Sequence, residues 1–217
     1  MPFVLPHRQP GDLLIVTGLL CLAGLWLGPL PGLAAQSFSA HMLLHLGVMS
    51  LAAPLLALGL ARSGLRWSWL EGGRGWLAGL FMAELLVVWG WHVPALHEAA
   101  AGRVWVFVIQ QLSFLLTGLA LWMAGFASER REAQAIALLG FGLTLGHMTM
   151  LGLLLALAPR LLYPAELCGG AFGFAGLEDQ RAGGVLMLRG ALLYLGGALA
   201  LGARLLGPAD SSPVSRT

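Results

Sequence analysis

The stretch that decides the fold is residues 104–127, which read VWVFVIQQLSFLLTGLALWMAGFA. It holds no charged side chain, and its apolar residues are too continuous for the alternation of a half-buried strand. A helix needs about 20 mostly apolar residues to cross the hydrocarbon core of a bilayer. The stretch therefore predicts a transmembrane helix.

Further apolar stretches lie on both sides of this one. The chain of 217 residues is 58% hydrophobic and 10% charged, with a mean hydropathy of +0.82, a composition that soluble domains do not have. The composition predicts an all-α integral membrane protein, a polytopic bundle of about six transmembrane helices in a single domain over residues 1–217. The expected spans are 13–30, 39–61, 75–91, 104–127, 133–158 and 183–206.

Arginine, the only basic residue type besides histidine, predicts the orientation. Eight arginines fall in the amino-terminal segment, the second and fourth connections and the carboxyl tail, whereas three fall in the other connections. By the positive-inside rule, both termini are cytoplasmic. The eight are Arg8, Arg62, Arg66, Arg74, Arg130, Arg131, Arg204 and Arg216, and the three are Arg103, Arg160 and Arg181.

Five of the six histidines fall toward the outer side in this topology; the exception is His7. His41 and His45 are four residues apart and project from one face of the second span. His92 ends the third span, His97 follows it, and His147 lies in the outer half of the fifth. Ionisable groups within membrane spans are expensive and usually functional, so the five histidines predict one shared site.

A histidine pair at i and i+4 is a natural half-site for a metal ion. Imidazole suits copper, zinc, iron and nickel, and neighbouring thioethers would favour Cu(I). Methionines lie near the expected site, although a methionine in an apolar helix is usually a packing residue. They are Met42, Met49, Met148, Met150 and Met187. Glu84, in the middle of the third span, predicts either a functional carboxylate or a buried pair, for which Arg189 is a candidate partner.

Four segments together resemble the CtaG family of assembly factors for caa3-type cytochrome c oxidase. They are SAHMLLH at 39–45, WHVPALHE at 91–98, GHMT at 146–149 running on to APRLLYP at 158–164, and EDQ at 178–180 with the glycines at 183–184. The resemblance implies a multi-pass protein of the bacterial inner membrane that takes part in oxidase maturation through the handling of copper. It carries over His41, His45, His92 and His147 as the family's histidines, and Asp179 as the acidic residue that precedes the last span.

The leading hypothesis is a non-enzymatic copper-binding assembly factor whose partners are oxidase subunits or other copper proteins. Its metal ligands would be His41, His45, His92 and His147, with His97 or Asp179 contributing. The first alternative is a b-type cytochrome with His45 and His147 as axial ligands of haem. A metal-dependent membrane enzyme, for example with zinc, is the second, although the chain has no H-E-x-x-H motif.

Overall fold

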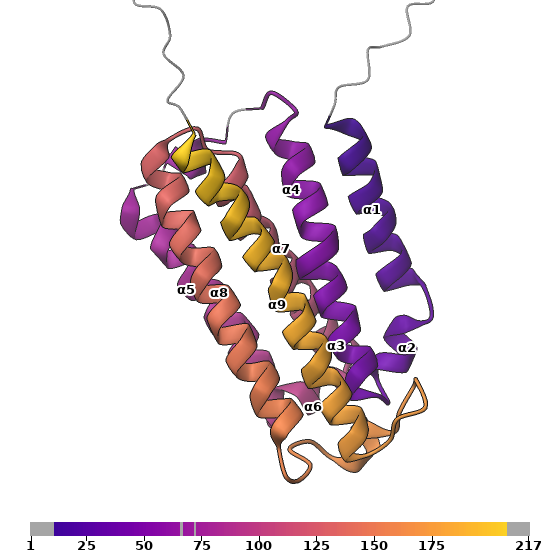
Figure 1. Cartoon of the computed structure of the whole chain (residues 1–217). Helices are drawn as coiled ribbons and strands as arrows, with labels where there is room; N and C mark the ends of the chain where they lie inside the picture. The colour runs from indigo at the N-terminus through magenta and orange to yellow at the C-terminus, as the bar shows by residue number, and fades with distance from the viewer. Residues whose placement is uncertain (1–10, 66, 72, 208–217) are drawn as a thin grey trace, which may run out of the picture.

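The computed structural model describes residues 11–65, 67–71 and 73–207, and within these residues all regular structure is helical. His7, Arg8, Arg66 and Arg216, which entered the sequence predictions, lie outside the described residues. Figure 1 shows the helices arranged as a bundle. The α-helices are α1 (Asp12–Leu27), α2 (Leu30–Ala34), α3 (Phe38–Gly47), α4 (Ala53–Ala61), α5 (Arg74–Trp91), α6 (Pro94–Gly102), α7 (Val104–Phe126), α8 (Arg131–Leu157) and α9 (Leu177–Leu206).

Four of the described helices are long and apolar enough to cross a membrane. They are Phe38–Ala61, Val104–Phe126, Arg131–Leu157 and Leu177–Leu206. A fifth span results if α5 and α6, which meet at a bend of 75°, are taken as one. α1 is apolar but has only 16 residues. The multi-span helical class is thus confirmed, whereas the count of six and the orientation in the bilayer stay predictions.

The span Phe38–Ala61 is continuous but not uniform. A π-helical turn, Val48–Ala52, joins α3 to α4 just before Pro54, a residue that has no backbone N–H to donate. The altered turn changes which carbonyls are used within the helix, and the carbonyl of Met49 accepts a hydrogen bond from the Tyr194 hydroxyl at 3.5 Å. α9 therefore supports the span at its irregular point.

α8 and α9 make the most extensive helix pair in the bundle, and small residues allow their close approach. A Cβ atom on Gly184 would lie 2.5 Å from the backbone nitrogen of Ala156, and one on Gly152 would lie 3.0 Å from the carbonyl oxygen of Gly184. The Gly75-x-x-x-Gly79 motif has no such role, because nothing lies within 4 Å of a Cβ at either glycine.

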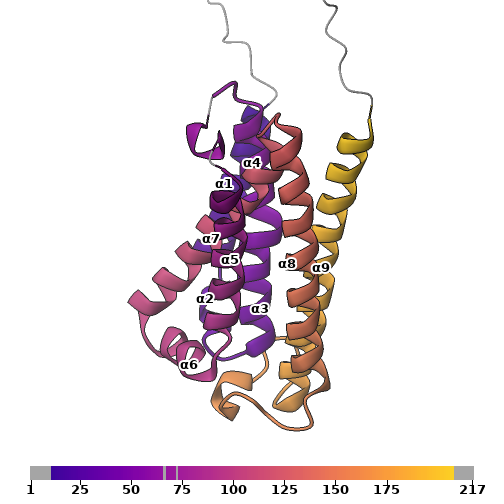
Figure 2. The same cartoon turned by 90° about the vertical axis from the view of Figure 1, so that its left-hand side faces the viewer.

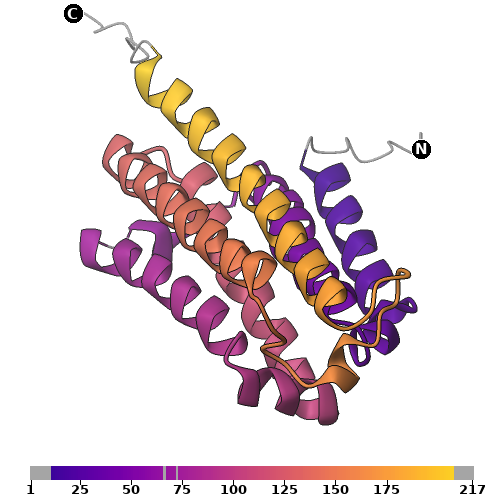
Figure 3. The same ribbon diagram turned by 60° about the horizontal axis from the view of Figure 1, so that its bottom comes forward.

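The connections divide between two ends of the bundle, as Figure 2 shows. The start of α1, the end of α9 and the links α4–α5 and α7–α8 lie at one end. α2, α6 and the segment 158–176 lie at the other end, which we call the histidine end for reasons given below. Figure 3 brings this end forward and shows the segment 158–176 passing from α8 to α9.

Candidate functional site: a buried histidine cluster

Four histidines meet inside the histidine end of the bundle. His41 and His45 come from α3, His92 caps the end of α5, and His97 lies in α6. The ring centroids of His41 and His97 are 4.3 Å apart, those of His41 and His45 are 5.2 Å apart, and those of His45 and His92 are 5.3 Å apart. Each of the four side chains is buried, His92 being the most exposed at 7%. We call these four residues the histidine cluster.

The bend between α5 and α6 brings His92 and His97 to the same place. Val93 is extended, with a ψ of 127°, as expected for a residue that precedes proline, and Pro94 begins α6. The Nδ1 atom of His92 donates a hydrogen bond to the Val88 carbonyl at 2.6 Å, which fixes the ring. This bond leaves Nε2 of His92 as the nitrogen with a free lone pair.

Aromatic rings cover the cluster. Phe38 and Tyr163 lie 5.2 and 4.6 Å from the His97 ring, and Phe114 lies 4.7 Å from the His45 ring, between centroids. The Tyr163 hydroxyl donates to the His92 carbonyl at 2.8 Å, and burial raises the pKa of Tyr163, so this donor stays protonated. These three aromatic rings thereby shield the histidines from the surface of the protein.

Most of the cluster's ring nitrogens are buried without a hydrogen-bond partner among the residues that the structure describes. Unpaired buried polar groups are rare in proteins, because each costs about 1–3 kcal/mol. In the described part of the chain, the buried histidine nitrogens without a hydrogen bond are His41 Nε2, His45 Nδ1 and Nε2, His92 Nε2, His97 Nδ1 and His147 Nδ1. The residues present therefore offer a set of free imidazole lone pairs in one place.

His147 is held by Glu84. Its Nε2 atom lies 2.9 Å from Oε2 of Glu84, and the Thr144 hydroxyl donates to the same oxygen at 3.1 Å. Glu84 is completely buried, and its other oxygen has no hydrogen-bond partner in the described part of the chain. The sequence left open whether Glu84 is a functional carboxylate or part of a buried pair; in the structure it is paired, and its partner is His147 rather than Arg189. With Nε2 facing the carboxylate, Nδ1 of His147 is left free.

Asp179 is engaged at the start of α3. Its carboxylate accepts hydrogen bonds from the Phe38 N–H at 2.7 Å, from the Ser37 hydroxyl at 3.0 Å, and from both the N–H and the hydroxyl of Ser39. A helix N-terminus has free N–H groups and favours a negative charge. The carboxylate therefore positions the first turn of α3, the helix that carries His41 and His45.

A small cavity reaches His41 from outside the bundle. It has a volume of about 290 Å³ and is lined by residues of α2, α6 and the start of α7, among them Ala34, Ala101 and Phe107. His41 is the one ring of the histidine cluster among the residues that line it. The cluster is thus approached past His41, between α2 and α6.

The predicted methionines differ in exposure, and Cys168 is buried. Met150 is 57% exposed, whereas Met42, Met49, Met148 and Met187 are buried. Burial raises the pKa of the Cys168 thiol to about 11, with a smaller contribution from Asp179, so this thiol stays neutral.

Gln110 and Gln111 of α7 are buried, and each has an atom with no hydrogen-bond partner among the described residues. The sequence signal for this pair is two adjacent amides in an otherwise apolar span.

The side chains of the histidine cluster lie close together, but they do not enclose a metal-binding site. Within the described residues, no group of three or more His, Cys, Asp or Glu side chains is arranged to hold a metal ion. The free nitrogens lie in one region, but they do not converge on a point.

Comparison with known proteins identifies the family. The sequence profile of the cytochrome c oxidase caa3 assembly factor family matches residues 12–206, which include all nine α-helices described above. Comparisons with curated proteins and with solved structures give no match. Because the family match covers most of the chain, the protein belongs to the cytochrome c oxidase caa3 assembly factor family.

Proposed function

We propose that the protein binds copper at the histidine cluster and passes it to a cytochrome c oxidase subunit, or to another copper protein, during assembly. Copper is the cargo in this proposal, and the protein is not an enzyme. The ligands would be drawn from His41, His45, His92 and His97, with His147 at the edge of the cluster nearest the middle of the membrane. The histidine end would face the periplasm of a bacterial inner membrane, as the distribution of arginines predicts.

The unpaired ring nitrogens are the observation that carries the proposal. Five of them belong to the histidine cluster and are buried without a hydrogen bond to any described residue. A protein that kept these groups only for packing would lose about 1–3 kcal/mol for each. Because a neutral imidazole has one lone pair, an ion could remove this cost at one nitrogen of each histidine, and imidazole is a preferred ligand of copper.

The spacing of the rings also fits a shared ion. With metal–nitrogen bonds of about 2.0–2.1 Å, imidazoles around one tetrahedral ion have centroids roughly 5 Å apart. Neighbouring rings of the cluster are 4.3 to 5.3 Å apart. Each pair of neighbouring rings is therefore close enough for both imidazoles to reach one ion.

The surroundings of the histidine cluster suit a site that takes up and releases copper. The cavity beside His41 gives a route to the cluster, so a donor or acceptor protein could exchange ligands there first. The aromatic rings of Phe38, Phe114 and Tyr163 exclude water from the other sides. Asp179 holds α3 in place, and Glu84 and Val88 hold the rings of His147 and His92.

Haem fits this arrangement less well than a single ion. Haem b would require His45 and His147 to face each other across the macrocycle. Instead, the ring of His45 lies 5.2 and 5.3 Å from those of His41 and His92, and Nε2 of His147 faces Glu84. The adjacent histidine rings thus favour an ion over a planar cofactor.

Metal analysis of the purified protein tests the proposal. We expect about one copper ion per chain after loading, and no Soret band in the visible spectrum. In the His41→Ala/His45→Ala double variant, copper should fall to background, because both ligands of α3 are removed.

Phe114→Leu is the matched control. Phe114 packs against the ring of His45 but has no donor atom, so the variant perturbs packing and keeps every ligand. Copper content should stay near that of the unmodified protein. Equal copper content in the double variant and the control would refute the proposed ligands. A Soret band with bound iron would mean that the protein binds haem rather than copper.

A further inference from the structure

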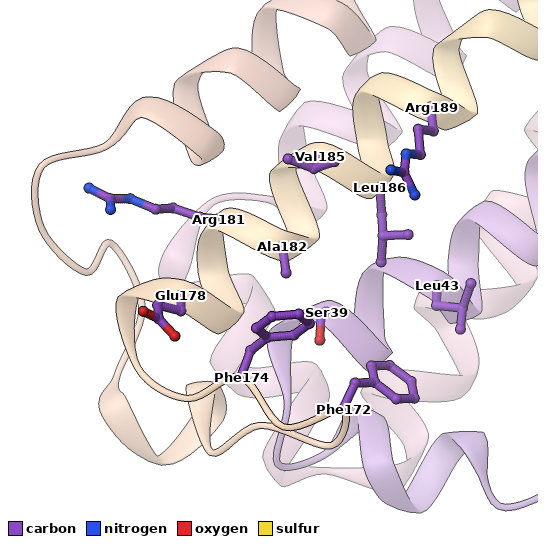
Figure 4. A pocket seen from close by; sticks show the side chains of 10 residues that line it. All are labelled: Ser39, Leu43, Phe172, Phe174, Glu178, Arg181, Ala182, Val185, Leu186 and Arg189. Carbon is purple, nitrogen blue, oxygen red and sulfur yellow. The ribbon is translucent and has the colours of Figure 1, made fainter.

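A groove on the surface of the bundle lies between α3, α9 and the segment 158–176. It has a volume of about 690 Å³ and a mostly apolar lining that includes Leu43, Phe172, Phe174, Val185, Leu186 and Arg189. Figure 4 shows Phe172 and Phe174 reaching into it from the segment 158–176, at the histidine end. Figure 4 also shows Arg181 pointing away from Leu43 and Phe172, whereas the guanidinium of Arg189 lies beside Leu186.

Within the residues that the structure describes, Arg189 is a cation without a partner, and it lies in the candidate span Leu177–Leu206. It is exposed, and it makes no hydrogen bond or ion pair with any residue that the structure describes. α9 has 30 residues and is about 45 Å long, which exceeds the hydrocarbon thickness of about 30 Å. Arg189 is 12 residues beyond Leu177, so its Cα lies roughly 10 Å inside the hydrocarbon if the helix is centred in the bilayer.

The counter-ion of Arg189 must come from another molecule. Charged side chains inside membranes pair with one another or face a polar cavity, because an unpaired charge there costs several kcal/mol. In the described part of the chain, Glu84 is the one carboxylate in the middle of a span, and it is fully buried against Thr144 and His147. A second copy of this chain therefore offers no accessible carboxylate at the right depth.

We propose that the groove docks a transmembrane helix of another protein, one that carries an aspartate or glutamate in the half of its span nearer the histidine end. The carboxylate pairs with Arg189, and an apolar side chain nearer the membrane surface fills the space between Leu43 and the two phenylalanines. A lipid phosphate is a poorer match, because phosphates lie at the membrane surface whereas Arg189 lies at the deeper end of the groove.

The inference deepens the proposed function and rests on it, because the proposed function identifies the partner as a protein whose assembly this chain assists. α3 contributes Ser39 and Leu43 to the groove, and it contributes His41 and His45 to the histidine cluster. A helix docked in the groove therefore lies directly against the helix that carries two of the proposed copper ligands. This contact would bring a client subunit to the cluster.

Photo-crosslinking in native membranes tests the docking. A photoreactive phenylalanine analogue replaces Leu193, which is 49% exposed, lies one turn beyond Arg189 and does not line the groove. The full chain is produced in cells that also assemble their oxidase, and the crosslinked peptides are identified by mass spectrometry. The same analogue at Leu139, an exposed residue of α8, reports non-specific crosslinks.

We expect an adduct at residue 193 with one transmembrane helix that contains an aspartate or glutamate. Arg189→Leu should lower its yield about tenfold, and Arg189→Lys should restore most of it, because the charge returns. Exchange of the charges, with Arg189→Glu here and arginine for the partner's carboxylate, should also restore it. Adducts with lipid alone, with a helix that lacks a carboxylate, or in equal yield after Arg189→Leu would overturn the proposal.

Copper content keeps this test separate from that of the proposed function. Arg189 lies outside the histidine cluster, so Arg189→Leu should bind as much copper as the unmodified chain if it folds normally. Loss of the adduct with normal copper content supports docking through Arg189. A normal adduct from a chain that binds no copper would refute the copper proposal and leave the docking intact.

Discussion

Glu84 shows how one buried carboxylate can orient a histidine. The carboxylate faces Nε2 of His147 and also accepts from Thr144, so the ring is fixed with Nδ1 free. Carboxylate–histidine pairs of this kind orient metal ligands and raise their basicity. The residue is therefore best understood as a positioning group behind His147.

Replacement of Glu84 tests this role. Glu84→Ala should weaken copper binding by about 10- to 100-fold, because His147 loses the group that orients it. Glu84→Gln should recover part of the affinity, since the amide oxygen still accepts a hydrogen bond. The measurement is competition with a copper chelator of known affinity.

Thr144→Val is the control for that comparison. It removes the second hydrogen bond to Oε2 of Glu84 and leaves the His147 contact intact. Copper affinity should change by less than about threefold. If Glu84→Ala and Thr144→Val had the same affinity, Glu84 would have only a structural role.

At the scale of the elements, the contact between α8 and α9 holds the two long spans together. The backbones approach closely at Gly152 and Gly184, where a Cβ on either residue would meet backbone atoms of the facing helix. Such contacts cannot be relieved by moving a flexible side chain. The two glycines therefore allow the helix pair to form at this distance.

Gly184→Ala should destabilise the protein. The added methyl group would meet Ala156 N at 2.5 Å, and overpacking of this kind costs about 1–3 kcal/mol. Gly196→Ala, on the same helix, is the control, because nothing lies within 4 Å of a Cβ atom at this position and alanine favours a helix. Thermal unfolding in a mild detergent should show a lower midpoint for Gly184→Ala alone. Equal midpoints would mean that α8 and α9 can move apart to accommodate the methyl group without loss of stability.

Across the whole molecule, the sequence predicts the long helices well because apolar length has a simple physical meaning in a bilayer. The stretches 75–91 and 104–127 agree with α5 and α7 to within one residue at each end. Apolar length does not predict the extra helical turns at the start of α9, since Glu178 and Asp179 are charged. Asp179 is nevertheless buried there, because its carboxylate accepts hydrogen bonds from the first turn of α3.

The meeting of the histidines was only partly predictable. The spacing of four residues places His41 and His45 on one face, as α3 confirms. His97 joins them because of the 75° bend after His92, and the angle of such a bend depends on tertiary packing rather than on local sequence. The same reason explains why Glu84 faces His147 rather than Arg189, since helix rotation decides which residues of different spans meet.

The most direct test of the central claim is X-ray absorption at the copper edge of the loaded protein. Copper held by the histidine cluster should show two to four nitrogen neighbours at about 2 Å, with the outer-shell scattering of imidazole. The His45→Ala variant should lose at least one of these neighbours. A first shell made of sulfur or oxygen, or a spectrum unchanged by His45→Ala, would contradict the assignment of the copper site to these histidines.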